Sequence, residues 1–283
     1  MGDKTIKRKK LFLLFLLLAV GVFFYIADTA VFHPNHDENS RIYMAARSGF
    51  ETVEFASNNR IIHGMLRRNT GSESSPLVIF FYGNAQNAAG TMRAMDEFGI
   101  WPYFLDYHCL IVDYPGYGPD SRGRPSVKNI YETALAAYDY ARTLPGVSRI
   151  IAGGFSLGTG PAAYLAAHRN LDGLFLLSPF ANTYDLYNNV LPVFYGPMRL
   201  FIRHSFRSDQ HAQNITMPVL LVASLSDEII PFESSERLNG SFSGQTVFVT
   251  LSGVSHGSIL FNRTALDSVK AYLQMLESQT PDP

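Results

Sequence analysis

The hydrophobic residues of this chain fall into short runs separated by amphipathic stretches. Two alternating runs, 51–55 and 60–67, flank a polar turn and predict an antiparallel hairpin at the edge of a sheet. The compact apolar runs that follow are typical of strands covered on both faces: 77–82, 109–113, 149–152, 174–177, 219–223 and 246–251. Helical patterns separate these runs, most clearly at 129–142 and 263–276. The alternation predicts an α/β fold with a mostly parallel sheet, right-handed crossovers and helices on both faces.

The first 30 residues have a different pattern. Residues 4–10 are rich in lysine and arginine, and residues 11–27 carry no charged side chain. An apolar helix of that length spans about 25 Å, the short end of what crosses a bilayer. A cleaved signal peptide has the same basic start, but no small-residue cleavage site follows here, which favours an uncleaved anchor. We therefore expect a basic cytoplasmic tail at 1–10 and a transmembrane signal anchor at 11–30, with the rest of the chain periplasmic, lumenal or extracellular.

The remaining residues are expected to form a connecting segment at 31–48 and one domain over 49–283. The stretch between the runs at 174–177 and 219–223 is longer than one crossover needs, which predicts a small helical lid at about 180–216. Two short helices around a Pro/Gly break are expected in it, with Arg199, Arg203 and Arg207 on one helix face. A net charge of -1 gives no excess charge to attract nucleic acid, and a single cysteine excludes an internal disulfide.

The strongest chemical signal lies at 153–160. A strand-like run leads into this segment and a helix-forming run leads out. Within it, Gly154-x-Ser156-x-Gly158 has the spacing of a nucleophile elbow, in which glycines let the backbone turn so tightly that the central side chain is left exposed in strained geometry. Ser156 is therefore the candidate nucleophile. The plainer alternative is a glycine-rich turn with an ordinary serine.

A triad on this kind of sheet places the acid and the histidine after later strands, in the order serine, acid, histidine. Asp227 follows the penultimate predicted strand and is the expected acid, with Glu228 and Asp185 as alternatives. His256 follows the last predicted strand in a loop between glycines, where an imidazole can reach the elbow. The order Ser156, Asp227, His256 predicts a catalytic triad.

The turn at 83–87 follows the predicted strand at 77–82 and is the candidate oxyanion loop. The backbone N–H of Asn84, with Ala85 as the alternative, and the backbone N–H of Leu157 are expected to hold an oxyanion.

Taken together, these motifs resemble the α/β-hydrolase superfamily over about residues 50–277. They look most like its membrane-anchored serine hydrolases of the BEM type and ABHD type. The residues that carry the resemblance are Tyr82-Gly83-Asn84-Ala85, Asp113-Tyr114-Pro115-Gly116-Tyr117-Gly118, the elbow, Asp227 with Ile230-Pro231, and His256. Relatives usually have His at the position of Tyr82 and Gly at that of Ser224, and often Gly at that of Gln86, differences that bear on the oxyanion loop and substrate preference.

The resemblance implies hydrolysis of esters or thioesters, as in lysophospholipases, monoacylglycerol lipases and protein depalmitoylases. We therefore expect a membrane-anchored serine hydrolase whose partners are the lipid bilayer and an ester or thioester substrate, with no metal or organic cofactor and no nucleic acid. Two alternatives stay open. One is a catalytically silent membrane-anchored binding protein on the same fold, since a fold alone does not fix function. The other is a serine peptidase, although such enzymes usually carry an added propeller or large cap.

Overall fold

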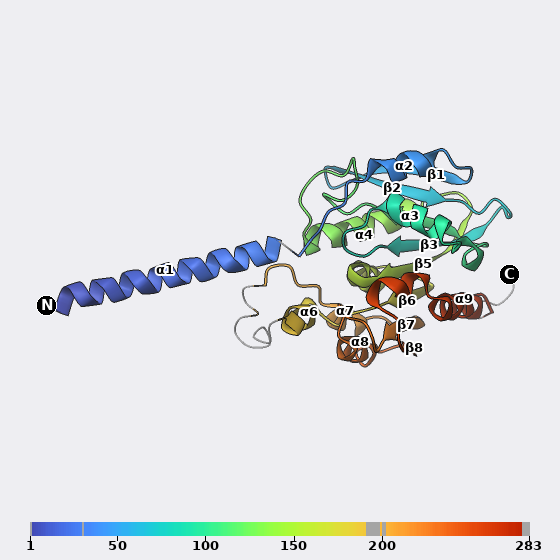
Figure 1. Cartoon of the computed structure of the whole chain (residues 1–283). Coiled ribbons are helices and arrows are strands. Elements are labelled where there is room, and N and C mark those ends of the chain that lie inside the picture. Colours follow the sequence, from blue (N-terminus) through green and yellow to red (C-terminus); the bar gives the residue numbers. More distant parts are fainter. Residues whose placement is uncertain (1, 30, 191–198, 200–201, 279–283) are drawn as a thin grey trace.

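The computed structural model describes residues 2–29, 31–190, 199 and 202–278. The N-terminal helix α1 (Gly2–Thr29) projects from a layered α/β unit as a long rod (Figure 1). The transmembrane anchor expected at 11–30 is not shown by the structure, because no helix in the part of the chain it describes has a stretch long and apolar enough to cross a membrane.

The described residues contain an eight-stranded sheet in the order β1-β2-β4-β3-β5-β6-β7-β8 (Figure 1). Its strands are β1 (Phe50–Ser57), β2 (Arg60–Arg67), β3 (Ser75–Phe81), β4 (His108–Val112), β5 (Val147–Phe155), β6 (Gly173–Leu177), β7 (Val219–Ser224) and β8 (Thr246–Leu251). Strand β2 pairs antiparallel with β1 and with β4, and the other neighbours are parallel. The edge hairpin turns at Asn58 and Asn59, whose φ angles of 43° and 64° are those that a tight two-residue hairpin turn requires. The sheet is thus mostly parallel with an antiparallel edge hairpin, as the sequence predicts.

The direction of each crossover decides which face a helix covers. The described helices of the sheet are α2 (Glu38–Ala45), α3 (Ala88–Glu97), α4 (Val127–Ala141), α5 (Thr159–His168), α8 (Phe232–Asn239) and α9 (Arg263–Ser278). The crossover from β3 through α3 leads to β4 on one side, whereas those through α4, α5 and α8 lead toward the other side. Because crossovers are right-handed, α3 lies on the opposite face from α4, α5 and α8. A ring contact between Phe98 and Phe261, with centroids 4.3 Å apart, joins the end of α3 to the turn before α9.

This topology fixes where a ligand can bind. The neighbouring strands β3 and β5 send their following helices to opposite faces, so a crevice opens between the carboxyl ends of these two strands. The candidate oxyanion loop follows β3 and the elbow follows β5. The two motifs found in the sequence therefore meet at the point where the fold favours a site.

The expected lid is described only in part. Helices α6 (Thr183–Val190) and α7 (Ser208–Ala212) belong to the described residues, whereas the expected break at 192–197 lies outside them. The expectation that Arg203 and Arg207 share a helix face with Arg199 is wrong, because residues 202–207 are not helical. Part of this segment instead bonds back to the start of α6, where Phe206 accepts a hydrogen bond from the N–H of Thr183 at 3.1 Å.

Candidate active site

The elbow joins β5 to α5 through the single turn η2 (Ser156–Gly158). Ser156 has a φ of 53°, which is unfavourable for a residue with a side chain. Both flanking glycines are needed for steric reasons. A Cβ on Gly158 would lie 2.0 Å from the carbonyl oxygen of Phe81 in β3, and one on Gly154 would lie 2.6 Å from the carbonyl oxygen of Gly158. The sequence pattern therefore corresponds to a tight, strained turn that holds Ser156 at the end of β5.

Ser156, His256 and Asp227 form one chain of hydrogen bonds. The Nε2 atom of His256 lies 2.8 Å from the Oγ of Ser156, and its Nδ1 atom lies 2.9 Å from both carboxylate oxygens of Asp227. The side chain of Asp227 is 2% exposed and that of His256 is 13% exposed. An imidazole bound at Nδ1 by a carboxylate presents Nε2 as an acceptor for the serine proton. The three residues predicted from their order in the sequence are thus brought together from the ends of β5, β7 and β8.

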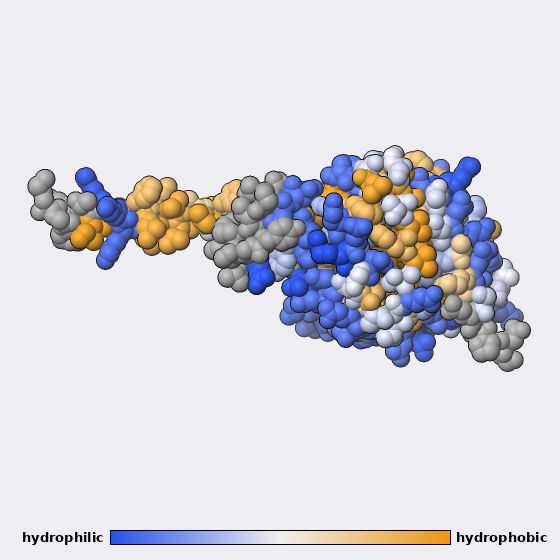
Figure 2. All heavy atoms as spheres, turned by 90° about the horizontal axis from the view of Figure 1, so that it is seen from below, coloured by the Kyte–Doolittle hydropathy of each residue, from blue (hydrophilic) through white to orange (hydrophobic). Residues whose placement is uncertain are grey.

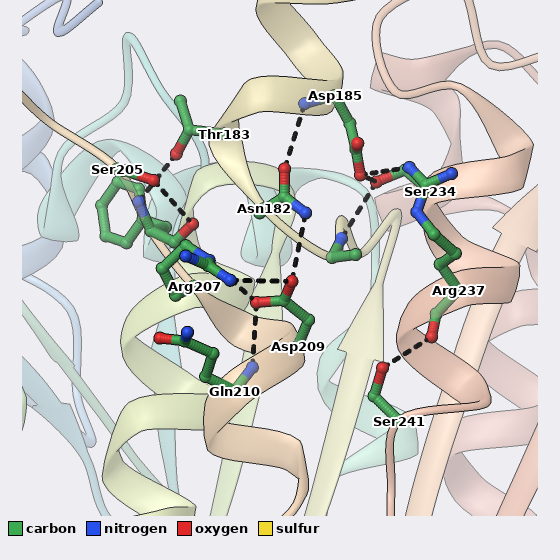
Figure 3. Close-up of polar contacts among 12 residues, drawn as sticks. Asn182, Thr183, Asp185, Ser205, Arg207, Asp209, Gln210, Ser234, Arg237 and Ser241 are labelled. Atoms are coloured by element: carbon green, nitrogen blue, oxygen red, sulfur yellow. Dashed lines mark hydrogen bonds and ion pairs between the residues drawn. The ribbon is translucent and has the colours of Figure 1, made fainter. Parts of the chain in front are cut away.

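The three acids considered from the sequence have different surroundings. Burial disfavours the charge of Asp227, but hydrogen bonds from His256 and from the N–H groups of Ile230 and Ile229 outweigh it and lower the pKa of the carboxyl group. Glu228 instead accepts the backbone N–H of His256 at 3.0 Å. Asp185 is buried in α6, where the hydroxyl of Ser234 and the guanidinium of Arg237, both from α8, bind its carboxylate, each at 2.5 Å (Figure 3). The contacts therefore favour Asp227 as the acid.

Further hydrogen bonds hold the loop after β7 against the loop after β8. The hydroxyl of Ser224 donates to the carbonyl oxygen of Val254 at 2.6 Å, and the hydroxyl of Ser226 accepts the N–H of Gly253 at 3.0 Å. These two hydrogen bonds join the loop that carries Asp227 to the loop that carries His256. Sequence reasoning missed them, and the one available signal was that Ser224 stands where relatives of the resembled family usually have glycine.

In the oxyanion loop, residues 83–87, some backbone N–H groups have acceptors within the loop and others do not. The N–H of Ala85 bonds to the Oδ1 of Asn84 at 3.2 Å, and the Oε1 of Gln86 accepts the N–H of the first loop residue at 2.8 Å. For the N–H of Asn84, no acceptor is found among the residues that the structure describes. The N–H of Leu157 lies in the first turn of η2, where a helix leaves such groups without an acceptor of its own. The expected pair, Asn84 and Leu157, therefore remains the candidate pair of oxyanion donors.

A buried carboxylate binds both ends of the oxyanion loop. The Oδ1 of Asp113 accepts the hydroxyl of Tyr82 at 3.2 Å, just before the loop, and the N–H of Ala88 at 2.7 Å, just after it. The Tyr82 hydroxyl also accepts the N–H of Tyr114 at 3.0 Å. Burial raises the pKa of Asp113 to about 7, although both hydrogen bonds to its oxygen oppose that rise. Tyr82, which departs from the histidine usual in the resembled family, thus helps to support the loop.

The two ends of the segment between β6 and β7 meet in a polar network, which we call the insertion neck (residues 181–183 and 206–209; Figure 3). The N–H of Phe206 donates to the hydroxyl of Thr183 at 2.7 Å, and the amide of Asn182 donates to Asp209 at 3.2 Å. Phe206 is buried against α5, because a Cβ on Gly160 would lie 2.5 Å from its ring. The segment therefore leaves and rejoins the fold beside the helix that follows the elbow.

The groups at this edge of the sheet suit nucleophilic acyl chemistry. A hydroxyl, an imidazole and a carboxylate follow one another at hydrogen-bond distances. Within the described part of the chain, no group of three or more histidine, cysteine, aspartate or glutamate side chains is placed to hold a metal ion. The serine hydroxyl offers a nucleophile and the imidazole a general base.

Comparisons with known proteins identify the family to which this fold belongs. The family model described as the alpha/beta hydrolase fold matches residues 76–209. An uncharacterised protein of Mycobacterium tuberculosis is 30% identical over 230 residues, which cover 80% of this chain and 79% of that protein. The chain belongs to the α/β-hydrolase superfamily.

Further similarities place this α/β-hydrolase in the ABHD branch. The lysophosphatidylserine lipase ABHD12 of Danio rerio is 30% identical over 185 residues, which cover 58% of this chain and 47% of that protein. The chain thus spans about half the length of that relative. Among solved structures, Est1E from Butyrivibrio proteoclasticus has a TM-score of 0.64 at 18% identity and covers 81% of this chain and 99% of its own. At that identity the likeness shows the fold alone.

Proposed function

We propose that this α/β-hydrolase is a membrane-anchored serine hydrolase that cleaves carboxylic esters or thioesters of lipid or other acyl substrates. The observation that carries the proposal is the unbroken hydrogen-bond chain from Asp227 through His256 to Ser156, which ends at a strained turn. Membership of a hydrolase superfamily supports the reaction class.

In the proposed reaction, His256 takes the hydroxyl proton of Ser156 at Nε2 while the serine oxygen attacks the acyl carbonyl. Asp227 stabilises the imidazolium that results, and the N–H groups of Asn84 and Leu157 bind the oxyanion of the tetrahedral intermediate. The imidazolium then protonates the leaving alcohol or thiol, which leaves an acyl-enzyme on Ser156. His256 next deprotonates a water molecule that attacks this ester, and the same proton returns to Ser156 as the acid is released.

An apolar acyl group is the substrate feature that the surroundings favour. A relative carries the name lysophosphatidylserine lipase. The segment that enters through the insertion neck is rich in aromatic and aliphatic residues, and Phe206 is buried beside α5. Each acyl CH₂ group buried in such surroundings adds about 0.8 kcal/mol of binding free energy.

Helix α1 is the proposed membrane anchor, a role that rests on the uncharged apolar sequence of residues 11–27 and not on a membrane span found in the structure. Its large apolar side chains from Leu11 to Leu18 are between 47% and 68% exposed. Figure 2 shows them as an apolar band beyond a basic cluster that includes residues 7–10. The positive-inside rule then places the basic end in the cytoplasm and the α/β domain on the periplasmic, lumenal or extracellular side.

The test of the proposed function is a substrate panel measured on the full-length protein and on Ser156→Ala. We expect kcat/KM to rise along p-nitrophenyl esters from acetate to at least octanoate, and Ser156→Ala to abolish this turnover. A fall beyond butyrate would refute the proposed preference for long acyl chains and leave a short-chain esterase. Faster cleavage of a matched acyl-peptide anilide would indicate a peptidase. Absence of turnover with folded protein on every ester, thioester and anilide would favour a silent binding protein.

A further inference from the structure

The segment that follows α1, residues 31–37, lies along the oxyanion loop. It bonds to that loop and to the turn at 116–118 through both backbone and side-chain groups. The contacts include Asn84 Nδ2 to Val31 O at 2.7 Å, His33 N to Asn84 Oδ1 at 2.9 Å, Asn35 Nδ2 to Ala85 O at 3.0 Å, Asn87 Nδ2 to Asp37 O at 3.2 Å, and Gly118 N to Asn35 O at 2.8 Å. Residues 31–37, which are about 50 positions away in the sequence, thus pack along one side of the oxyanion loop.

The side chain of Asn84 serves this junction. Its Oδ1 accepts the N–H of His33 and the hydroxyl of Tyr117, the latter at 2.6 Å, while its Nδ2 donates to Val31. The amide is therefore held by the segment 31–37 together with Tyr117. The backbone N–H of the same residue is the candidate oxyanion donor. Contacts that fix the side chain of Asn84 therefore also restrict the direction of this N–H.

Ala85, the next residue, has a φ of 61°, which is disfavoured for a residue with a Cβ. Such a conformation persists when the surroundings hold it. Here the amide of Asn35 binds the carbonyl oxygen of Ala85. Loss of that donor frees Ala85 to relax and to carry the neighbouring N–H of Asn84 with it.

The same segment reaches the insertion neck. Phe32 is 7% exposed, and its ring centroid lies 5.2 Å from that of His204 and 6.4 Å from that of Phe206. Residues 31–37 are therefore packed against one end of the expected lid as well as against the oxyanion loop.

We propose that residues 31–37 are a positioning element of the active site, in which Asn35 holds Ala85 so that the N–H of Asn84 is aimed at the oxyanion. The segment that follows the proposed anchor α1 is then also part of the support of the oxyanion loop. This inference rests on the proposed serine-hydrolase function, since it assigns how one oxyanion donor of that reaction is oriented.

Asn35→Asp is the sharpest test. A carboxylate keeps the size of the side chain and still accepts the N–H of Asp37, which Asn35 Oδ1 now accepts at 2.9 Å, but it cannot donate to Ala85. We expect kcat for p-nitrophenyl octanoate to fall about 10-fold with KM within twofold, because removing an oxyanion donor outright costs about 10²- to 10³-fold and a misdirected donor costs less. The second-order rate of fluorophosphonate labelling should fall by the same factor. Asn39→Asp makes the same chemical change on an exposed residue of α2 and should match the wild type.

The outcomes separate this inference from the proposed function. Labelled wild type with unchanged kcat in Asn35→Asp overturns the positioning role alone. A rise in KM at constant kcat also overturns it, since that pattern means contact with substrate. Wild-type protein that neither labels nor turns over substrate refutes the proposed function itself. If Asn35→Asp fails to fold, Asn35→Ala, measured in the same way, decides the matter.

Discussion

The hydroxyl of Tyr82 lies 3.2 Å from the Oδ1 of Asp113, and both side chains are buried behind the oxyanion loop. The same oxygen accepts the N–H of Ala88 at 2.7 Å, so one carboxylate ties together the two ends of the loop. The loop is thereby supported from inside the domain by Asp113 and from outside by residues 31–37.

The first prediction concerns this buried hydrogen bond. Tyr82→Phe leaves the carboxylate of Asp113 and the N–H of Tyr114 without the hydroxyl that they share. Because buried polar groups without a partner are costly, the free energy of unfolding in urea should fall by about 1–3 kcal/mol. Tyr140→Phe is the matched control. Tyr140 is half-buried and stacks on Phe55, and in the described part of the chain its hydroxyl makes no hydrogen bond, so the change should stay within about 0.5 kcal/mol. Equal losses in the two variants would contradict the account.

Asp113 also sets a dependence of stability on pH. Burial raises the pKa of its carboxyl group from the usual 3.8 to about 7, so the folded state keeps a proton that the unfolded state loses. The contribution to stability is complete below about pH 4 and is lost as the pH rises to about 7. Between about pH 5 and 7 the free energy of unfolding should therefore fall by roughly 1 kcal/mol per pH unit from this group.

Asp113→Asn mimics the protonated carboxyl group and should remove that slope in urea titrations at several pH values. Arg41 and Asp120 also act on the charge of Asp113, so the difference between the two proteins at each pH isolates the contribution of Asp113 itself. Parallel pH profiles for wild type and Asp113→Asn would show that the group does not titrate in this range.

The next prediction separates the two buried acids. Asp227→Asn should lower kcat by about 10³- to 10⁴-fold while the protein stays folded, because an amide favours the wrong tautomer of His256. Asp185→Asn should leave kcat within about threefold and lower stability instead, because it weakens the pairing with Arg237 and Ser234 that joins α6 to α8 (Figure 3). Steady-state kinetics and urea unfolding on both variants check this. Loss of activity in Asp185→Asn alone would move the acid to α6.

The proposed anchor predicts a change in membrane binding. Leu17→Lys places a charge in the apolar band of α1, where it should cost about 2.5–3.5 kcal/mol of insertion free energy. The variant should shift toward the soluble fraction after carbonate extraction. Ile61→Lys is the control, since Leu17 and Ile61 are each 60% exposed but Ile61 lies in the edge hairpin of the domain. Equal partitioning of the two variants would argue against α1 as the anchor.

Much of the fold could be predicted from hydrophobic period, because the strands of a parallel sheet are buried on both faces and leave compact apolar runs. The residue at which β5 ends could not be predicted in this way. Gly153 and Gly154 look like turn residues, yet they continue the strand, since β3 and β6 pair with them on either side and the ring of Phe175 fills the space above Gly153.

The site shows the same division. Ser156, Asp227 and His256 stand out in sequence because their order along an α/β sheet is constrained. Ser226 and Asn35 do not stand out, because their partners are set by how loops meet across the sheet and not by local pattern. Supporting residues of this kind become visible in three dimensions only.

The most direct test of the central claim is to map the site of covalent modification by a fluorophosphonate. Full-length protein is treated with the probe and digested, and the adduct is located by tandem mass spectrometry, with His256→Ala and Ser156→Ala in parallel. The account predicts one adduct on Ser156 in the wild type, a much slower reaction in His256→Ala because the general base is missing, and none in Ser156→Ala. Folded wild-type protein that gives no adduct, or that carries it on a different residue while Ser156→Ala still labels, would contradict the assignment of Ser156 as the nucleophile.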